Sequence, residues 1–146
     1  MKPHDVPDGP LLIDTDVISY WIVQAGAGED FKPLVPGHEQ AISFATYGEL
    51  LANAHRRRWG ERNMRALHHR LSNFVVVPYS AAIVDRWAEM HAKVSGHLHK
   101  GGTNDLWTAA CAVATSPGLP VVTNNLGDFE TIAKAFPDLR LVHPSL

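Results

Sequence analysis

The stretch Leu11-Leu12-Ile13-Asp14-Thr15-Asp16 decides the fold, because three consecutive apolar residues lead directly into two acidic residues. A short, uninterrupted apolar run is typical of a strand that is buried on both faces of a parallel sheet. The segment from Asp16 to Gln24 follows at once and is expected to be a helix. A buried strand joined directly to a helix is the repeating unit of an α/β protein.

The same alternation continues to the end of the chain. The expected strands are residues 11–13, 41–45, 74–77, 119–122 and 139–142. The expected helices are residues 16–24, 46–73 with a break near Gly60, 80–98, 103–115 and 128–136. Loops are expected at 26–37 and 96–102, where glycine and proline gather. This pattern predicts an α/β fold with a five-stranded, mainly parallel sheet flanked by helices, in a single domain spanning 1–146.

Composition excludes several classes of protein. Of the 146 residues, 45% are hydrophobic, and the formal net charge is −2. A chain of this length can fold around one core without disulfides or structural zinc, and the lone Cys111 can form no internal disulfide. No apolar run approaches the roughly 18 residues of a membrane span, and residues 1–10 do not resemble a signal peptide. We therefore expect a cytoplasmic protein with no contact to a membrane.

Five acidic residues are expected at or near helix N-termini: Asp14, Asp16, Glu49, Asp105 and Asp128. Each has a purely structural explanation, because acids are favoured in the first turn of a helix. Thr46 and Glu49 have the spacing of a capping box, and Asp128 is a plausible N-cap. These explanations account for the residues one by one, but not for their joint distribution along the chain.

The joint distribution predicts a metal site. The carboxyl ends of parallel strands open onto one rim of the sheet, and Asp14, Glu49 and Asp128 each follow a different expected strand. Carboxylates crowded into one cleft repel each other unless their pKa rises or a divalent cation binds. Hard oxygen ligands without Cys or clustered His select Mg²⁺ or Mn²⁺. Such ions assist attack on a phosphodiester, so a nuclease is expected.

Four segments carry these acids in a characteristic order. They are Leu12-Ile13-Asp14-Thr15-Asp16-Val17, Thr46-Tyr47-Gly48-Glu49-Leu50, Thr103-Asn104-Asp105-Leu106-Trp107-Thr108-Ala109-Ala110 and Val122-Thr123-Asn124-Asn125-Leu126-Gly127-Asp128-Phe129. Together they resemble the four successive acidic motifs of the PIN-domain ribonucleases, and more narrowly those of the VapC-type toxins of toxin–antitoxin pairs. The resemblance runs from about residue 11 to the end of the chain and implies a three-layer PIN-like fold.

The resemblance also implies roles for individual residues. It makes Asp14, Glu49, Asp105 and Asp128 the acidic quartet around one or two Mg²⁺ or Mn²⁺ ions, with metal-activated water as the nucleophile. Residues that orient this quartet are expected to be Thr15, Asn104 and Thr123. Asp16 stands where the family usually has Asn, and either adds a fifth carboxylate or caps the first helix. A toxin of this type further implies a cognate antitoxin whose basic tail enters the acidic cleft, and a homodimer.

A basic segment lies between the second and third acidic motifs. From Asn53 to Asn73 the chain carries six arginines and one glutamate. The arginines are either a solvated helix face or a surface for the phosphate backbone of RNA. The candidates for RNA binding are Arg56, Arg57, Arg58, Arg62 and Arg65. Trp59 lies among them and is the candidate for stacking on a base, whereas Trp21 and Trp107 are expected in the core.

Two other interpretations remain open. Asp14-Thr15-Asp16 after an apolar strand also resembles the nucleophile motif of haloacid-dehalogenase-like phosphatases, in which Asp14 would be phosphorylated and Asp16 would act as acid and base. Alternatively, the chain is a non-catalytic module that uses a PIN scaffold to bind RNA or protein. The sequence does not identify the RNA or its cleavage site.

Overall fold

The computed structural model of the protein describes residues 1, 5–23, 36–99, 103–115 and 117–146. Its sheet has five strands in the order β3-β2-β1-β4-β5, and all four neighbouring pairs are parallel. The strands are β1 (Leu11–Ile13), β2 (Gln40–Ile42), β3 (Val75–Val76), β4 (Val121–Val122) and β5 (Leu141–Val142). The prediction of a five-stranded α/β sheet is therefore confirmed.

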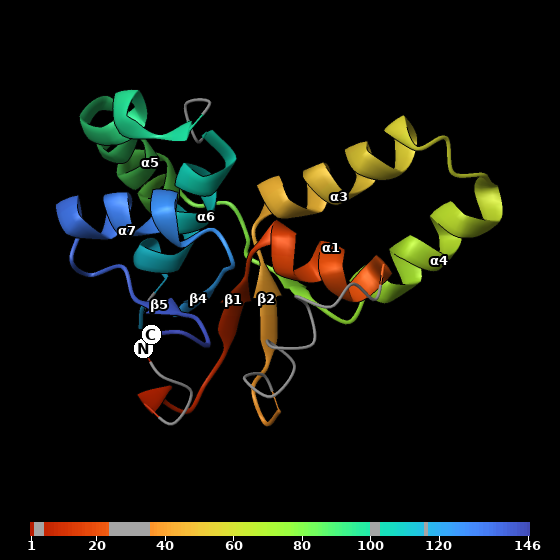
Figure 1. The fold of residues 1–146 in the computed structure, drawn as a ribbon, viewed down its shortest axis with the longest axis horizontal. Helices are drawn as coiled ribbons and strands as arrows, with labels where there is room; N and C mark the ends of the chain where they lie inside the picture. The colour runs from red at the N-terminus through yellow and green to blue at the C-terminus, as the bar shows by residue number, and fades with distance from the viewer. Residues whose placement is uncertain (2–4, 24–35, 100–102, 116) are drawn as a thin grey trace.

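Helices cover both faces of the sheet and make three layers (Figure 1). On one side lie α1 (Thr15–Val23), α3 (Phe44–Arg56) and α4 (Glu61–Leu71). On the other side lie α5 (Ala81–Val94), a 3₁₀ turn at Ser95–His97, α6 (Thr103–Ala114) and α7 (Leu126–Ala135). The C-terminal end of α3, the turn after it and α4 project from the sheet as a hairpin (Figure 1).

The central strand β1 shows why the opening apolar run forms this fold. Side chains alternate between the two faces of a strand, and all three residues of β1 have no exposed surface. Leu12 packs into the apolar cluster that contains side chains of α5, α6 and α7. Leu11 and Ile13 pack into the opposite cluster, with side chains of α1, α3 and α4. Both faces of β1 must therefore be apolar, which an uninterrupted run provides.

Several predicted boundaries are corrected by the structure. The break expected near Gly60 is confirmed, because α3 ends at Arg56 and α4 begins at Glu61. The first of these helices begins two residues earlier than expected, at Phe44, because the side chain of Ser43 accepts a hydrogen bond from Thr46 N at 3.0 Å. The capping box expected at Thr46 and Glu49 is thus wrong, and Glu49 lies in the second turn. The N-cap of α7 is Asn125 rather than Asp128. Residues 24–35 and 100–102, which include most of both expected loops, lie outside the described residues.

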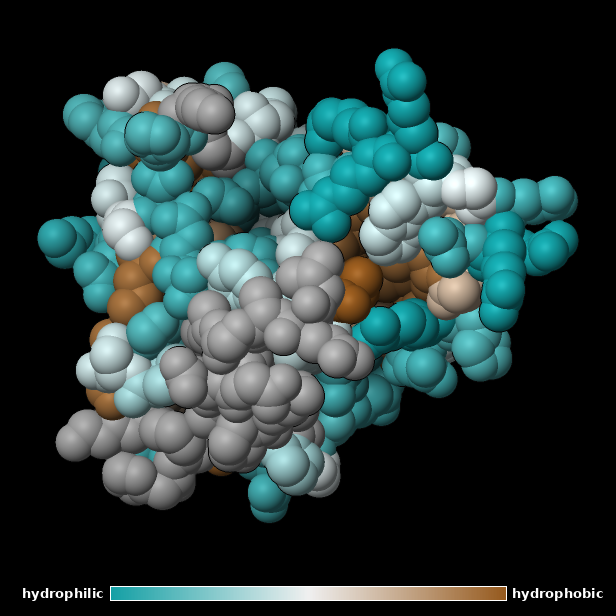
Figure 2. Space-filling model, turned by 45° about the vertical axis from the view of Figure 1, so that its right-hand side comes forward, coloured by the Kyte–Doolittle hydropathy of each residue, from teal (hydrophilic) through white to brown (hydrophobic). Residues whose placement is uncertain are grey.

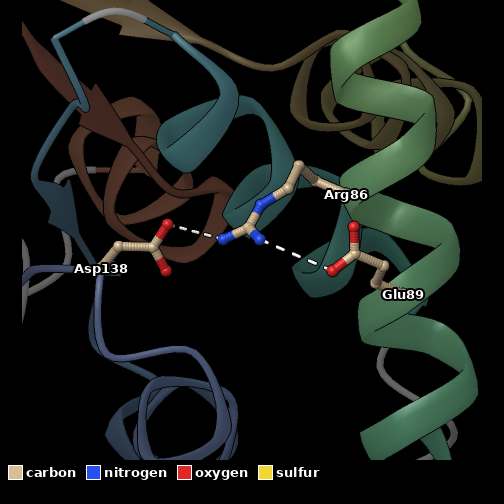
Figure 3. A network of polar contacts seen from close by, with 3 residues as sticks. All are labelled: Arg86, Glu89 and Asp138. Atoms are coloured by element: carbon tan, nitrogen blue, oxygen red, sulfur yellow. Dashed lines mark hydrogen bonds and ion pairs between the residues drawn. The ribbon is translucent and has the colours of Figure 1, made fainter.

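An ion-pair network links α5 to the segment that precedes β5. Arg86 of α5 donates to Asp138 across 2.6 Å and lies 3.6 Å from Glu89 (Figure 3). The Arg86 guanidinium also lies over the Phe136 ring, 5.4 Å from its centre. The chain leading into β5 is thereby joined to α5. No helix in the described part of the chain is long and apolar enough to cross a membrane.

Candidate active site

A polar cleft of about 350 Å³ opens at the carboxyl ends of the central strands. We call it the acidic cleft. Its walls come from α1, α3, α6 and the segment after β4. The lining residues are Asp14, Thr15, Asp16, Ser19, Tyr20, Glu49, Asn53, Arg57, Asp105 and Asn125. Four of the five predicted acids therefore line one cleft, although they are far apart in the sequence.

Asp14 is held at the base of the cleft by the scaffold. It follows β1, its backbone N–H donates to Val122 O at 2.9 Å, and its side chain is only 4% exposed. One carboxylate oxygen accepts from Thr15 N at 2.8 Å, and the other accepts from the Thr123 hydroxyl at 2.9 Å. Thr123 is fully buried and also accepts from Asn125 N at 3.0 Å. The Asp14 carboxylate thus has a fixed orientation.

Glu49 reaches the cleft from α3, and the hydroxyl of Thr15 positions it. Thr15 Oγ1 donates to Glu49 Oε1 at 2.9 Å and lies 3.0 Å from Thr46 Oγ1. The N-terminus of α3 is attached to α6 through the buried side chains of Ser43 and Thr108, whose hydroxyl oxygens are 3.0 Å apart. This contact between α3 and α6 fixes the helix that carries Glu49 against the helix that carries Asp105.

Asp105 and Asp128 are joined by one amide. Asn125 Nδ2 donates to Asp105 Oδ2 at 3.0 Å and lies 3.4 Å from Asp128 Oδ2. Asp128 is not among the residues that line the cleft, but its other carboxylate oxygen accepts from His99 N at 3.0 Å. The fifth acid therefore contacts the same amide as Asp105 without lining the cleft.

Burial raises the pKa values of three acids, and repulsion from neighbouring acids raises two of them further. Loss of hydration raises the pKa of Asp14 well above its ordinary range, and the charges of Asp16 and Asp105 raise it further. Burial also raises the pKa of Asp16. Burial, followed by the charges of Asp128, Glu49 and Asp16, raises the pKa of Asp105 to about 7. A divalent cation would relieve this repulsion, so the electrostatics of the cleft favour its binding.

The donor set of the cleft fits a hard cation. Its candidate ligands are carboxylate oxygens, and neither Cys nor His is among the lining residues. Among the residues that the structure describes, no three His, Cys, Asp or Glu side chains already stand together as a group of metal ligands. The carboxylates instead bond to Thr15, Thr123 and Asn125.

Some polar residues around the acids were not singled out from the sequence. Asn104, predicted to orient the acids, is exposed on α6, and the amide that contacts Asp105 belongs to Asn125. The contact between Ser43 and Thr108 also went unpredicted. The role of Ser43 as an N-cap could have been predicted, because serine is common directly before a helix. Nothing in the sequence distinguishes Asn125 from its neighbour Asn124.

The predicted RNA-binding arginines are exposed on α3, α4 and the turn between them. They are Arg56, Arg57, Arg58, Arg62 and Arg65. Arg57 alone in this group also lines the acidic cleft. Trp59 is half-buried and packs against the apolar cluster under α3 and α4. Trp21 and Trp107 are half-buried as well, each packed against one of the two core clusters.

Comparisons with known proteins agree with this geometry. The family model of the PIN domain matches residues 11–135. Ribonuclease VapC2 of Haemophilus influenzae is 26% identical over 121 residues, covering 83% of this chain and 90% of that protein. The tRNA(fMet)-specific endonuclease VapC of Shigella flexneri is 26% identical over 122 residues, covering 84% and 91%.

A solved structure shares the fold. In the VapBC2 complex of Rickettsia felis, solved with a DNA fragment from its promoter, one chain superposes with a TM-score of 0.71 at 24% identity, covering 90% of this chain and 96% of that one. These matches do not support the alternative of a haloacid-dehalogenase-like phosphatase. The acidic motifs, the parallel sheet and the family model agree, and the chain belongs to the PIN-domain family.

Proposed function

We propose that the protein is a Mg²⁺- or Mn²⁺-dependent endoribonuclease and the toxin of a toxin–antitoxin pair. The observation that carries this proposal is the acidic cleft, where residues from α1, α3 and α6 bring Asp14, Glu49 and Asp105 to one place. The similar proteins of H. influenzae and S. flexneri are named ribonuclease and endonuclease. Because the proposed substrate is RNA, we place the activity in the cytoplasm.

Asp14, Glu49, Asp105 and Asp128 would hold one or two ions, and the carboxylate of Asp16 lines the acidic cleft together with the first three of these acids. A bound divalent cation supplies charge neutralisation at the scissile phosphate and activation of a water for in-line attack. The chain's own contribution is orientation. Thr123 and Thr15 fix Asp14 and Glu49 by hydrogen bonds of 2.9 Å each, and such outer partners commonly change metal affinity or activity 10- to 100-fold, as an order of magnitude.

RNA enters from the side of α3 and α4. The five exposed arginines of this hairpin attract the phosphate backbone and bring it toward the cleft. Along α3, Glu49, Asn53 and Arg57 are spaced by four residues, so they lie along one face of the helix. All three line the acidic cleft. The RNA strand therefore passes along a single helix, from the basic surface of the hairpin to the carboxylates of the acidic cleft.

A cognate antitoxin with a basic tail covers the acidic cleft, and the protein forms a homodimer. The solved VapBC toxin–antitoxin complexes support the antitoxin partner, because in them a chain of this fold is combined with its antitoxin. Charge complementarity supports it as well, because several carboxylates face the same opening. Gel filtration of the protein, alone and co-expressed with the product of the neighbouring gene, tests both statements. A lone monomer under both conditions would contradict them.

Cleavage of a mixed RNA pool in the presence of Mn²⁺ tests the enzymatic proposal. The wild-type protein should cleave the pool, and chelation of the metal should abolish cleavage. Asp14→Asn should lower the rate by about 10³-fold or more, because it removes one of the charges that attract the ion. The matched control is Asp85→Asn, an exposed residue of α5, and should cleave normally. Equal cleavage by wild type and Asp14→Asn would refute the site.

A further inference from the structure

A second hollow adjoins the acidic cleft and has a different chemical character. Its volume is about 150 Å³, and its walls are mostly apolar. We call it the α1–α3 groove. The lining residues are Ser19, Tyr20, Ile22, Leu50, Asn53, Ala54, Arg57, Trp59 and Leu67. Figure 2 shows apolar surface in a hollow between strongly hydrophilic side chains, on the side of the molecule that carries α3 and α4.

The groove is continuous with the acidic cleft. Ser19, Tyr20, Asn53 and Arg57 line both hollows. A molecule whose charged part occupies the cleft can therefore place a neighbouring apolar part in the groove without leaving the surface. Arg57 stands between the two, and it is exposed.

From this arrangement we infer that the α1–α3 groove is a nucleobase subsite of the nuclease, which takes the base next to the scissile phosphate. The inference rests on the proposed function and deepens it. A volume of about 150 Å³ is half of the roughly 300 Å³ at which pockets for drug-sized ligands begin. The groove therefore fits a single ring system such as a nucleobase better than a folded segment of a protein.

The lining residues match the chemistry of a base. Trp59 and Tyr20 supply aromatic surface, and Asn53 and Ser19 supply polar groups near the opening. Aromatic side chains accept any base by stacking, whereas amide and hydroxyl groups distinguish one base from another. Arg57 at the boundary is suited to the phosphate that links this base to the nucleotide in the cleft.

The backbone around Trp59 is held in an uncommon conformation. Arg58 has a φ of 57°, in the left-handed region that L residues rarely adopt. Hydrogen bonds from Arg58 N to His55 O at 2.9 Å and from Trp59 N to Ala54 O at 3.1 Å close the turn after α3. This turn places Trp59 in the wall of the groove and leaves the charged side chains of Arg57 and Arg58 exposed.

The surrounding charge favours RNA as the occupant. Arg56, Arg57 and Arg58 are consecutive and exposed at the end of α3, Arg57 lines the groove, and Arg62 is exposed in the first turn of α4. An apolar groove in such a basic setting is suited to a ligand that has flat rings on a polyanionic chain. An antitoxin segment with an apolar side chain is the competing occupant, and the experiment below separates the two.

The experiment compares Trp59→Phe and Trp59→Leu with the wild type. Sequencing of the ends produced from a mixed RNA pool in Mn²⁺ identifies the base preferred on each side of the cut. Wild type and Trp59→Phe should share a preference at one flanking position. Trp59→Leu should lose it, because a base that is no longer held by stacking is not presented to Asn53 and Ser19. Circular dichroism and the Tm show whether each variant is folded, because Trp59 also packs on the core.

A binding measurement that is independent of cleavage completes the test. The Asp14→Asn protein is titrated with fluorescent single-stranded RNA of the preferred sequence, either intact or with an abasic site at the preferred position. Loss of that base should weaken binding by about 5- to 100-fold when Trp59 is present. In the double variant with Trp59→Leu, intact and abasic RNA should bind equally.

The outcomes are distinguishable. If the wild type neither cleaves nor binds RNA, the proposed function fails. If it cleaves, and Trp59→Leu retains both the base preference and the penalty for the abasic site, only the nucleobase subsite is overturned. If Trp59→Leu leaves RNA cleavage and binding unchanged but prevents complex formation with the co-expressed antitoxin, the groove is a protein-binding site and the inference is likewise overturned.

Discussion

The acidic cleft and the arginine hairpin, formed by α3 after Asn53 together with α4, differ in how the scaffold holds their charges. In the cleft, Asp14 is 4% exposed and accepts two hydrogen bonds from fixed neighbours. On the hairpin, Arg65 has a side chain that is 72% exposed, and it meets Glu61 at 3.4 Å. Buried, hydrogen-bonded charges are costly to disturb, whereas exposed pairs contribute little. Substitutions should therefore have large effects in the cleft and graded effects on the hairpin.

The largest expected effect beyond the acids themselves comes from Thr123→Val. This substitution keeps the shape of a fully buried residue but removes the hydroxyl that donates to Asp14 and accepts from Asn125 N. We expect a loss of kcat/KM of about 10- to 100-fold with weaker Mn²⁺ binding. Thr123→Ser should restore most of both. A fully active Thr123→Val would contradict the expectation that substitutions in the cleft have larger effects than substitutions on the hairpin.

The second expected effect is a dependence of protein stability on pH, measured with a chelator present. The folded protein raises the pKa of Asp105 to about 7 from an ordinary value of 3.8, so the folded state binds the proton more tightly than the unfolded state. This contribution to stability is fully present below about pH 4 and is lost as the pH rises toward 7. We expect the Tm of the chelated protein to fall over this range.

Two changes should reverse this decline. Asp105→Asn should recover about 1–2 kcal/mol at pH 8, because it removes a charge that burial and neighbouring acids disfavour. Mn²⁺ should raise the Tm of the wild type at pH 8 but have a weaker effect on this variant. Differential scanning calorimetry measures both. A chelated wild type whose Tm is equal at pH 5 and pH 8 would contradict the electrostatic account.

A smaller effect is expected on the hairpin. Arg62→Ala should weaken the binding of single-stranded RNA to the Asp14→Asn protein by about two- to five-fold and lower the slope of log K against log salt by about 1. Arg65→Ala should have no larger effect, since its guanidinium already pairs with Glu61. Fluorescence anisotropy at several salt concentrations measures the slope. An unchanged slope for both variants would show that RNA does not bind along the hairpin.

The smallest effect tests the turn that joins α3 to α4. Arg58→Gly should stabilise the protein by about 0.5–1 kcal/mol, because glycine adopts a φ of 57° without the steric cost of a side chain. Arg57→Gly is the matched control, since Arg57 has a φ of −79° and gains nothing from glycine. Urea denaturation compares the two. Destabilisation by Arg58→Gly would show that its side chain holds the turn.

The central strand and its acid were predictable because they are contiguous in the sequence. Leu11 to Ile13 must be apolar on both faces, and Asp14 follows at the end of the strand whatever the rest of the chain does. The start of α3 was not predictable in the same way, because Ser43 and Thr46 both precede segments with the pattern of a helix N-terminus. The structure selects Ser43, whose side chain also contacts Thr108.

The partners of the acids were harder to predict than the acids. Asn104 and Asn125 both lie within acidic motifs, but only the direction in which α6 and α7 leave the sheet decides which amide reaches Asp105. That direction depends on contacts between residues far apart in the chain. The α1–α3 groove was unpredictable for the same reason, since Tyr20 and Trp59 line one groove only when α1 packs beside α3.

The most direct test of the central claim is anomalous diffraction from crystals of the protein grown with Mn²⁺. Our account predicts a peak in the acidic cleft, about 2.0–2.3 Å from carboxylate oxygens of Asp14 and Asp105, and no peak there in Asp14→Asn crystals. Manganese bound elsewhere, with Asp14, Glu49 and Asp105 still bonded only to their protein neighbours, would contradict it.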